Sequence, residues 1–297
     1  MFRNLLTLIC TGILFLGANL QANEAGYDPV SMDPPQLDMA YPPDFAELLI
    51  PSHDVMLTGF MLVANGKGPH PSVLLLHGFP GNEKNLDLAQ SLRRAGYNVL
   101  FFHYRGAWGS QGDYTIAGQA DDVAAVLDYV RKEAQALRVD TGRISLIGHS
   151  MGGFTALRAA AAHKEIKCTV GLAAANFDEE TGLGGEQAKQ ELAAYTEQLF
   201  MLANYNGAKV LAEIQANAAA FDVRNQAGSF AGRSVLLITG NEDTEVPPAV
   251  QSLIAAAFEK VPGINLTSEF IPGDHAFSVS RIRLQRTVIE WMERNCR

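Results

Sequence analysis

The sequence contains few cysteines, few positive charges and few long apolar runs. Its 297 residues include 3 Cys, and 23 Lys and Arg stand against 32 Asp and Glu, which gives a formal net charge of -9. This balance, with no cluster of basic residues, argues against a nucleic-acid partner because nothing would attract a phosphate backbone. We interpret the negative charge as a contribution to solubility, and selection of a cationic substrate is the alternative. The sequence shows no Cys or His cluster at ligand spacing, so we expect neither a metal nor a cofactor.

The one apolar run that could enter a bilayer lies at the start of the chain. Arg3 and the amino terminus supply positive charge, Leu5 to Leu16 is mostly apolar, and Ala22 offers a small residue for cleavage. The run is shorter than the roughly 20 residues that span a bilayer. Residues 1–22 are therefore predicted to be a signal peptide cut after Ala22, and the mature protein to be periplasmic or secreted, without a stable membrane span. An uncleaved anchor is the alternative.

Signal-peptide cleavage would leave two cysteines in a compartment that permits disulfides. Cys10 departs with the signal peptide, Cys168 lies in a predicted buried strand, and Cys296 lies next to the carboxyl terminus. Pairing requires a geometry that sequence spacing does not define. Two free thiols are the default expectation.

The remaining chain has the composition of one large globular domain, with 47% hydrophobic and 19% charged residues. Residues 23–44 contain five prolines, which oppose helix formation, so this segment is predicted to be an extended leader. Residues 45–297 are predicted to form the domain itself.

Within this domain, short β-rich runs alternate with longer helical patterns. Strands are predicted at Val55 to Val63, Ser72 to Leu76, Asn98 to His103, Arg143 to Ile147, Lys167 to Ala173, Ser234 to Thr239 and Leu266 to Ile271. Helices are predicted at Asn82 to Arg94, Gln119 to Leu137, Met151 to Ala162, Pro247 to Lys260 and Val279 to Glu293. This alternation predicts an α/β fold with a mostly parallel central sheet and helices on both faces.

One connection is too long for this alternation. Residues 175–233 contain two helical patterns, Glu186 to Ala203 and Ala208 to Ala220, where one helix is expected. We predict a small helical cap over the carboxyl edge of the sheet, where open α/β sheets bind their ligands. Extra packing without a functional role is the alternative.

The strongest chemical signal is Gly148-His149-Ser150-Met151-Gly152, between a predicted strand and an Ala-rich helix. A sharp strand-to-helix turn of this pattern strains the serine backbone and exposes its hydroxyl at the carboxyl edge of the sheet. The following helix directs backbone N–H groups and its positive dipole end at an oxyanion forming there. Ser150 is therefore the predicted nucleophile, and an ordinary serine in a Gly-rich turn is the alternative.

A serine nucleophile needs a histidine base and a carboxylate that orients the histidine. Of 7 His, five precede Ser150 and His163 ends the helix that follows it. Only His275 lies beyond a later predicted strand, just before the last predicted helix. The acid should follow the preceding strand, and Asp243 is predicted over Glu242 and Glu245. A solvated acidic loop is the alternative.

Taken together, these motifs resemble the α/β hydrolases, in particular the serine-hydrolase branch with dienelactone-hydrolase-like and prolyl-oligopeptidase or serine-aminopeptidase-like domains. The resemblance covers roughly residues 46–294. The matching segments are Gly148-His149-Ser150-Met151-Gly152-Gly153, His77-Gly78-Phe79-Pro80-Gly81, the loop Gly240-x-x-Asp243-x-x-Val246-Pro247, and Gly273-Asp274-His275. They are specific for an α/β-hydrolase fold, and none identifies a substrate.

The resemblance also implies roles for residues outside the triad. The backbone N–H groups of Phe79 and Met151 would form the oxyanion hole, and the Phe79 ring would line the pocket. Arg105, in the loop Tyr104-Arg105-Gly106-Ala107-Trp108-Gly109-Ser110, would brace the active-site loops by hydrogen bonds.

The predicted activity is that of an exported serine hydrolase, which cleaves carboxylic esters through an acyl-enzyme on Ser150. Its partner would be a small acyl substrate. A serine aminopeptidase-like amide hydrolase is the alternative, in which the carboxylates of Asp178, Glu179 and Glu180 would capture a substrate ammonium group. A binding protein on a hydrolase fold that lacks chemistry is an alternative of a different class.

Overall fold

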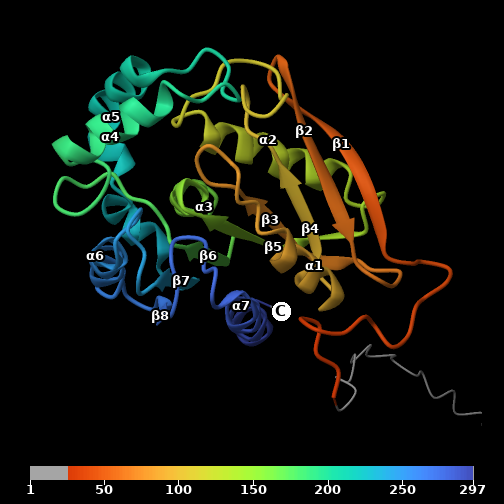
Figure 1. Cartoon of the computed structure of the whole chain (residues 1–297). Helices are drawn as coiled ribbons and strands as arrows, with labels where there is room; N and C mark the ends of the chain where they lie inside the picture. Colours follow the sequence, from red (N-terminus) through yellow and green to blue (C-terminus); the bar gives the residue numbers. More distant parts are fainter. Residues whose placement is uncertain (1–25, 297) are drawn as a thin grey trace, which may run out of the picture.

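A computed structural model describes residues 26–296. The predicted signal peptide, residues 1–22, lies outside this range. Eight strands form one sheet in the order β1-β2-β4-β3-β5-β6-β7-β8 (Figure 1). The β1–β2 and β2–β4 pairs are antiparallel, and every pair from β4 through β3 to β8 is parallel. The predicted mostly parallel sheet is therefore confirmed.

Strands β2 to β8 match the predicted positions, with differences of up to four residues at their ends. They are β1 Asp44–Ser52, β2 Val55–Val63, β3 His70–Leu76, β4 Asn98–Phe102, β5 Val139–His149, β6 Cys168–Leu172, β7 Ser234–Gly240 and β8 Asn265–Ile271. The sequence analysis predicts no strand at β1. Phe45 and Leu49 point to solvent from this strand and are 53% and 64% exposed, so apolar residues on both faces hide its period-2 pattern.

The helices follow the strands as expected. They are α1 Leu86–Arg94, α2 Gln119–Lys132, α3 Met151–Ala162, α4 Glu186–Thr196, α5 Gly207–Phe221, α6 Pro248–Phe258 and α7 Arg281–Asn295, with a 3-10 helix, η1, at Val223–Phe230. Helices α1 and α7 pack into one apolar core, and α2, α3 and α6 pack into a second core on the opposite face. Helices on both faces of the sheet are therefore confirmed.

Alternate side chains of each buried strand belong to different cores, one on each face of the sheet. In β3, Val73 and Leu75 belong to the core with α1 and α7, whereas Leu74 and Leu76 belong to the core with α2, α3 and α6. Successive side chains of a strand point to opposite faces, so a continuous apolar run fills both cores at once. This explains why the central strands have no polar face.

The segment between β6 and β7 contains α4, α5 and η1, at the end of the molecule away from β1 and β2 (Figure 1). The predicted helix Glu186 to Ala203 is too long, because α4 ends at Thr196. The chain then pairs with the loop that follows β4, through a β-bridge between Leu202 and Ala107. This tertiary pairing overrides the helical pattern. Glu213 of α5 fixes the segment further, since its carboxylate accepts hydrogen bonds from the N–H groups of residues 116 and 117.

The described part of the Pro-rich leader lies against the domain. The Tyr27 hydroxyl donates to the Arg94 carbonyl at 3.0 Å, and Arg94 Nε donates to the Pro29 carbonyl at 2.6 Å. Asp28 pairs with Arg286 of α7 at 2.6 Å. These contacts join the leader to α1 and α7.

Cys168 and Cys296 form a disulfide, so the expectation of two free thiols is wrong. Cys168 opens β6, and Cys296 directly follows α7. Helix α7 runs along the sheet until its last turn brings the two Cα atoms to 5.8 Å, within the range that a disulfide spans. The sequence separation of 128 residues gives no sign of this approach.

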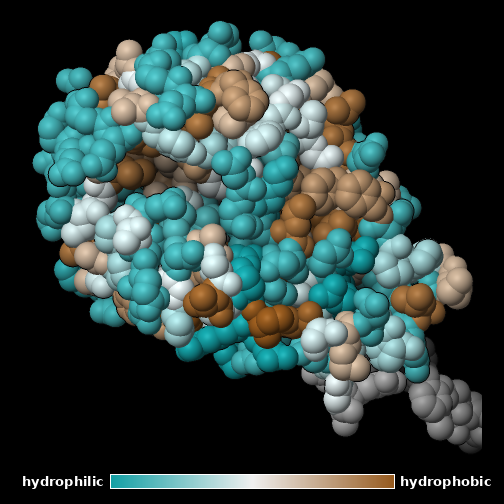
Figure 2. Space-filling view, in the orientation of Figure 1, coloured by the Kyte–Doolittle hydropathy of each residue, from teal (hydrophilic) through white to brown (hydrophobic). Residues whose placement is uncertain are grey.

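An apolar patch faces solvent on the antiparallel side of the sheet. The rings of Phe45 and Phe60 stack with centroids 5.0 Å apart, beside the exposed Leu49. Figure 2 shows apolar side chains gathered over β1 and β2. Within residues 26–296, no helix has both the length and the apolar character needed to cross a membrane.

Candidate active site

Ser150 lies at the turn between β5 and α3, in a backbone conformation that residues other than glycine rarely adopt. Its φ is 57° and its ψ is -123°. The turn is closed so tightly that a Cβ on Gly148 would lie 2.0 Å from the carbonyl oxygen of Gly152, and one on Gly152 would lie 2.2 Å from the carbonyl oxygen of Leu76. Glycine is therefore required at both positions, which is the physical reason for the sequence pattern.

Backbone hydrogen bonds hold this strained serine in place. The Ser150 N–H donates to the Leu172 carbonyl at 2.8 Å, and the Ser150 carbonyl accepts from Gly153 at 2.9 Å and from Ala175 at 3.0 Å. The side chain of Ser150 is partly exposed. Within residues 26–296, its hydroxyl makes no hydrogen bond, so it is available to a substrate.

Asp243 and His275 are in direct contact, as predicted. His275 Nδ1 lies 2.8 Å from Asp243 Oδ2, and because a carboxylate only accepts, Nδ1 carries the proton. The other oxygen, Asp243 Oδ1, accepts from the N–H groups of Glu245 at 2.9 Å and Val246 at 2.8 Å. The Asp243 side chain is fully buried and the His275 side chain is 12% exposed. This arrangement fixes the tautomer of His275 and leaves Nε2 free to accept a proton.

The histidine that precedes Ser150 connects the two parts of the site. His149 Nε2 donates to the His275 carbonyl at 2.8 Å, and the two rings lie 4.7 Å apart. Burial lowers the pKa of His149 to about 3, and the neighbouring His275 adds to the effect. His149 is therefore a neutral donor that positions the loop of His275. The sequence analysis does not assign it this role, since a histidine next to a serine carries no signal of its partner.

The two N–H groups predicted to bind an oxyanion belong to segments next to Ser150. Met151 is the first residue of α3, and Phe79 follows Gly78, where an added Cβ would lie 2.9 Å from Ser150 Cβ. Neither the Phe79 N–H nor the Met151 N–H donates to any group in the described part of the chain. Both donors are thus available for an oxyanion.

The loop that carries Phe79 is held by its own His77 and by side chains from the loop that follows β4. His77 Nδ1 donates to the Gly78 carbonyl at 2.8 Å, and Trp108 Nε1 donates to the Pro80 carbonyl at 2.7 Å. His77 Nε2 lies 3.3 Å from His103 Nδ1. Burial lowers the pKa of His77 to about 4, so its ring remains a neutral donor and acceptor.

Aromatic rings from the inserted segment stand next to Phe79. The Phe79 ring is 6.2 Å from that of Tyr195, in α4, and 6.4 Å from that of Tyr205, just before α5; it also lies 5.9 Å from that of Tyr114. Figure 2 shows a hollow with apolar residues at its base beside α4 and α5. The inserted segment between β6 and β7 thus packs against the oxyanion loop through Tyr195 and Tyr205.

Arg105 has the bracing contacts that the resemblance implies. Its Nε and Nη2 contact Asp122 Oδ1 at 2.9 Å and 2.8 Å, and Nη2 also donates to Ser52 Oγ at 3.0 Å. Asp122 is fully buried, so this ion pair fixes the loop after β4 to α2 and β1.

The acidic triplet considered for ammonium capture is not an open anionic site. Asp178 is 2% exposed, and its Oδ1 accepts from the N–H groups of Glu180 at 3.0 Å and Thr181 at 2.8 Å. Its carboxylate therefore stabilises a turn, and only Glu179 and Glu180 face solvent. These contacts argue against a role of Asp178 in binding a substrate ammonium group.

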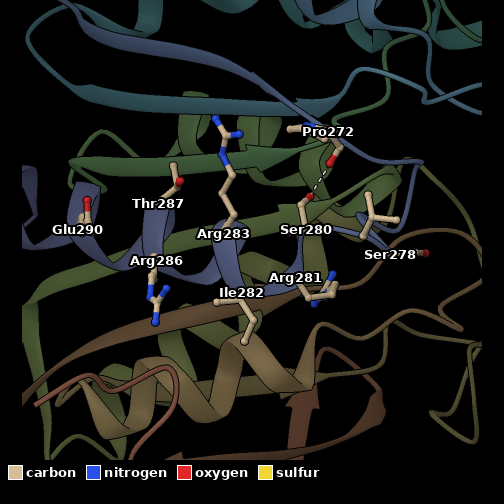
Figure 3. Close-up of a pocket in the computed structure, with 10 residues that line it drawn as sticks. Pro272, Ser278, Ser280, Arg281, Ile282, Arg283, Arg286, Thr287 and Glu290 are labelled. Carbon is tan, nitrogen blue, oxygen red and sulfur yellow. Dashed lines mark hydrogen bonds between the residues drawn. The ribbon is translucent and has the colours of Figure 1, made fainter.

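A surface depression of about 720 Å³ lies away from Ser150, along the outer side of α7 (Figure 3). Arg283 and Arg286 point in opposite directions from this helix, and Arg281 and Arg286 form ion pairs with Asp87 and Asp28. These pairs join α7 to α1 and to the leader. Among residues 26–296, no group of three or more His, Cys, Asp and Glu side chains is arranged to hold a metal ion.

Comparison with known proteins gives one family match and several curated relatives. A family described as alpha/beta hydrolase fold matches residues 71–198. An uncharacterized 31.7 kDa protein from the traX-finO intergenic region of Escherichia coli is 33% identical over 147 residues, 48% of this chain and 50% of the relative. The uncharacterized protein YfhR of Salmonella typhimurium is 35% identical over 89 residues, 30% of each chain. The matches thus span half or less of the length of these relatives.

Solved structures match over most of the chain. Est1E from Butyrivibrio proteoclasticus, solved with ferulic acid bound, has a TM-score of 0.64 at 21% identity and covers 84% of this chain and 98% of its own. The Pyrococcus furiosus esterase Pf2001 has a TM-score of 0.64 at 21% identity, covering 90% and 98%. The Pyrococcus horikoshii acylaminoacyl peptidase has a TM-score of 0.65 at 16% identity, covering 86% and 42%.

Proposed function

We propose that this chain, which has the α/β-hydrolase fold, is a serine hydrolase that cleaves carboxylic esters with Ser150, His275 and Asp243. The observation that carries the proposal is the pairing of a strained serine at the β5–α3 turn with a His275–Asp243 hydrogen bond of 2.8 Å at the same end of the sheet. The esterases among the structural neighbours support the ester reaction.

The reaction begins with proton transfer from the Ser150 hydroxyl to His275 Nε2 as the serine oxygen attacks the ester carbonyl. Asp243 keeps Nδ1 protonated and stabilises the imidazolium that forms. The N–H groups of Phe79 and Met151 donate to the oxyanion of the tetrahedral intermediate, assisted by the positive end of the α3 dipole.

Collapse of this intermediate breaks the bond between the acyl carbon and the leaving oxygen. His275 Nε2 returns its proton to the leaving alcohol, and the acyl group stays on Ser150. Water then attacks the acyl-enzyme with His275 as base, and the acid is released while Ser150 regains its proton. Asp243 is buried and its Oδ1 is bound by two backbone N–H groups, so its Oδ2 is held in place to orient His275 throughout.

Peptidase activity receives less support. The acylaminoacyl peptidase resembles this chain in fold at 16% identity. The carboxylate of Asp178, which would help to bind a substrate ammonium group in that reading, is occupied by backbone N–H groups of its own turn.

Export also belongs to the proposal. The signal peptide and its cleavage after Ala22 remain predictions for residues 1–22. The Cys168–Cys296 disulfide supports them, since structural disulfides persist in the periplasm and outside the cell and are rare in the cytosol.

The test compares wild type with Ser150→Ala on p-nitrophenyl esters of increasing acyl length and on aminoacyl p-nitroanilides. We expect wild type to cleave esters and to be labelled at Ser150 by a fluorophosphonate, and Ser150→Ala to lose about 10³-fold or more in kcat and all labelling. Ser252→Ala, an exposed serine of α6, is the matched control and should behave as wild type.

Labelling that persists in Ser150→Ala would exclude Ser150 as the nucleophile. Faster cleavage of anilides than of esters would replace the esterase assignment by that of a peptidase. A folded wild-type protein that neither turns over nor reacts with the probe would favour the non-catalytic alternative.

A further inference from the structure

Glu245 places a carboxylate beside the nitrogen of His275 that transfers protons. Its Oε2 lies 3.9 Å from His275 Nε2, and its side chain is 75% exposed. Its position follows from Asp243, because Asp243 Oδ1 accepts from the Glu245 N–H and thereby fixes the backbone of this residue two positions after the acid. Asp243 and Glu245 thus lie on opposite edges of the same imidazole ring.

This carboxylate has no permanently charged partner in the described part of the chain. Within residues 26–296, Glu245 makes no ion pair with a lysine or an arginine, and the side chain next to it is the imidazole of His275. Most other carboxylates around the site have partners: Asp243 binds His275, Glu242 accepts from the Gly273 N–H at 2.5 Å, and Asp178 stabilises its own turn. Glu245 is therefore an exposed carboxylate beside Nε2, the atom that exchanges protons with the substrate in the proposed reaction.

An aromatic ring from the inserted segment lies against Phe79 of the oxyanion loop. Tyr195 of α4 is 41% exposed, and its ring meets that of Phe79 edge-on. Burial, and after it the negative charge of Glu245, raise the pKa of the Tyr195 hydroxyl. A carboxylate near an aromatic ring is the combination that attracts an organic ammonium group, through charge and through cation–π contact.

The chemistry fixes which part of an ester would meet Glu245. His275 Nε2 donates its proton to the leaving oxygen when the C–O bond breaks, so that oxygen must come within about 3 Å of Nε2. The carbon atoms next to the leaving oxygen then lie beside Glu245 Oε2, whereas the acyl carbonyl oxygen lies at the N–H groups of Phe79 and Met151.

We propose that Glu245 and Tyr195 select esters whose alcohol carries a positive charge two or three bonds from the ester oxygen, such as esters of amino alcohols or of quaternary ammonium alcohols. This inference rests on the proposed ester hydrolysis and adds its substrate class. The bond that breaks and the path of the proton are those given above, and the cationic alcohol departs neutralised at its oxygen by the proton from Nε2.

The test uses two esters of one acid that differ only in charge: butyrylcholine, and 3,3-dimethylbutyl butyrate, in which carbon replaces the quaternary nitrogen. The kcat/KM of each is measured in a pH-stat, and the ratio of the two isolates the effect of charge. We expect wild type to favour the cationic ester by about tenfold in dilute buffer, as an unpaired charge at a partly exposed site would. The preference should shrink as salt rises, because salt screens exposed charges.

In Glu245→Gln, the ratio of kcat/KM for the cationic ester to that for the neutral ester should fall to within about twofold of unity. Because both esters are measured with the same variant, this ratio reports charge selectivity and is insensitive to a general loss of activity. Tyr195→Leu should lower the ratio partially by removing the cation–π contact. Glu259→Gln, an exposed carboxylate at the far end of α6, removes the same charge from the molecule and should leave the ratio at its wild-type value.

A wild-type enzyme that cleaves the neutral ester as well as the cationic one would overturn this inference and leave the proposed esterase function intact. If Glu245→Gln kept the preference for the cationic ester, another group would be responsible for the selectivity, and the inference would be overturned as well. Hydrolysis of neither ester, combined with no fluorophosphonate labelling, would refute the esterase function and with it the substrate class.

Discussion

Buried histidines next to Ser150 act as fixed neutral groups. Burial lowers the pKa of His149 to about 3 and that of His77 to about 4, below the value of about 6.5 expected for an unfolded chain. Each ring donates to a backbone carbonyl, His149 to that of His275 and His77 to that of Gly78. Protonation of either ring would place an uncompensated charge in the interior.

These shifts predict a loss of stability in mild acid. Between pH 6.5 and about 4 the unfolded chain binds protons at these histidines and the folded chain does not, so stability falls as pH falls through this window. We expect the free energy of unfolding to drop by about 2 kcal/mol per buried histidine between pH 7 and pH 5. Urea unfolding at the two pH values measures it.

The variant His149→Gln isolates the contribution of His149. It should reduce the drop in the free energy of unfolding between pH 7 and pH 5 by about 2 kcal/mol, the amount expected for one buried histidine. His53→Asn, at an exposed position, should leave the loss unchanged. Equal pH dependence in both variants would contradict the buried neutral state of His149.

The residues proposed for the triad can be chosen from sequence because each follows a strand at the same edge of the sheet. Asp243 is preferred over Glu242 and Glu245 by its place in the loop, and in the structure it alone reaches His275 Nδ1. What the sequence does not reveal is the use of the other two acids. Glu242 accepts a hydrogen bond from a backbone N–H, and Glu245 lies beside His275 Nε2. Both contacts depend on how the loops after β7 and β8 fold onto each other, which no local pattern encodes.

At the scale of elements, the junction of β5 and α3 is the most demanding in the fold. Its conformation depends on backbone atoms approaching where a side chain would stand, as at Gly148 and Gly152. The start of α3 therefore has one position relative to β3 and β5, which is what sets the direction of the Ser150 hydroxyl.

This packing predicts that Gly148→Ala destabilises the protein severely. The new Cβ would lie 2.0 Å from the Gly152 carbonyl oxygen, and both are backbone-anchored, so the strand and helix must separate. We expect a loss of about 3 kcal/mol or more in the free energy of unfolding. Gly228→Ala in η1, where a Cβ meets nothing within 4 Å, is the matched control. Similar unfolding curves for the two variants would refute this account of the turn.

Most element positions could be predicted because their apolar patterns are local. The α3 bounds agree with the prediction at both ends, since Ser150 and the residues after Ala162 interrupt the helix in the sequence itself. The helix predicted at Glu186 to Ala203 is too long because its end is set by pairing of Leu202 with Ala107, a contact across 95 positions that no local pattern encodes. Strand β1 is not predicted because of its local pattern: its outward-facing apolar residues obscure the alternation that identifies a strand.

At the scale of the whole molecule, the Cys168–Cys296 disulfide joins a central strand to the last helix. It closes a loop with a sequence separation of 128 residues, which constrains the unfolded chain strongly. We expect Cys296→Ser to lower the free energy of unfolding by about 2–5 kcal/mol. Thermal unfolding with and without dithiothreitol measures the effect.

Reductant should lower the unfolding temperature of wild type to near that of Cys296→Ser and should leave the variant unaffected. Equal unfolding temperatures for oxidised wild type and variant would show that the disulfide is not formed in the protein. The pairing escapes sequence analysis because only the path of α7 along the sheet brings the two thiols together.

The loop closed by this disulfide contains Asp243, His275 and the whole inserted segment, whereas Ser150 lies before it. A protease that cuts the exposed chain around Glu179 would therefore produce two fragments, one with the nucleophile and one with the acid and the base, still joined by a covalent bond. Such a nicked molecule would migrate as an intact chain on a gel without reductant and as two bands with it. The disulfide thus keeps both halves of the proposed triad in one particle after backbone cleavage.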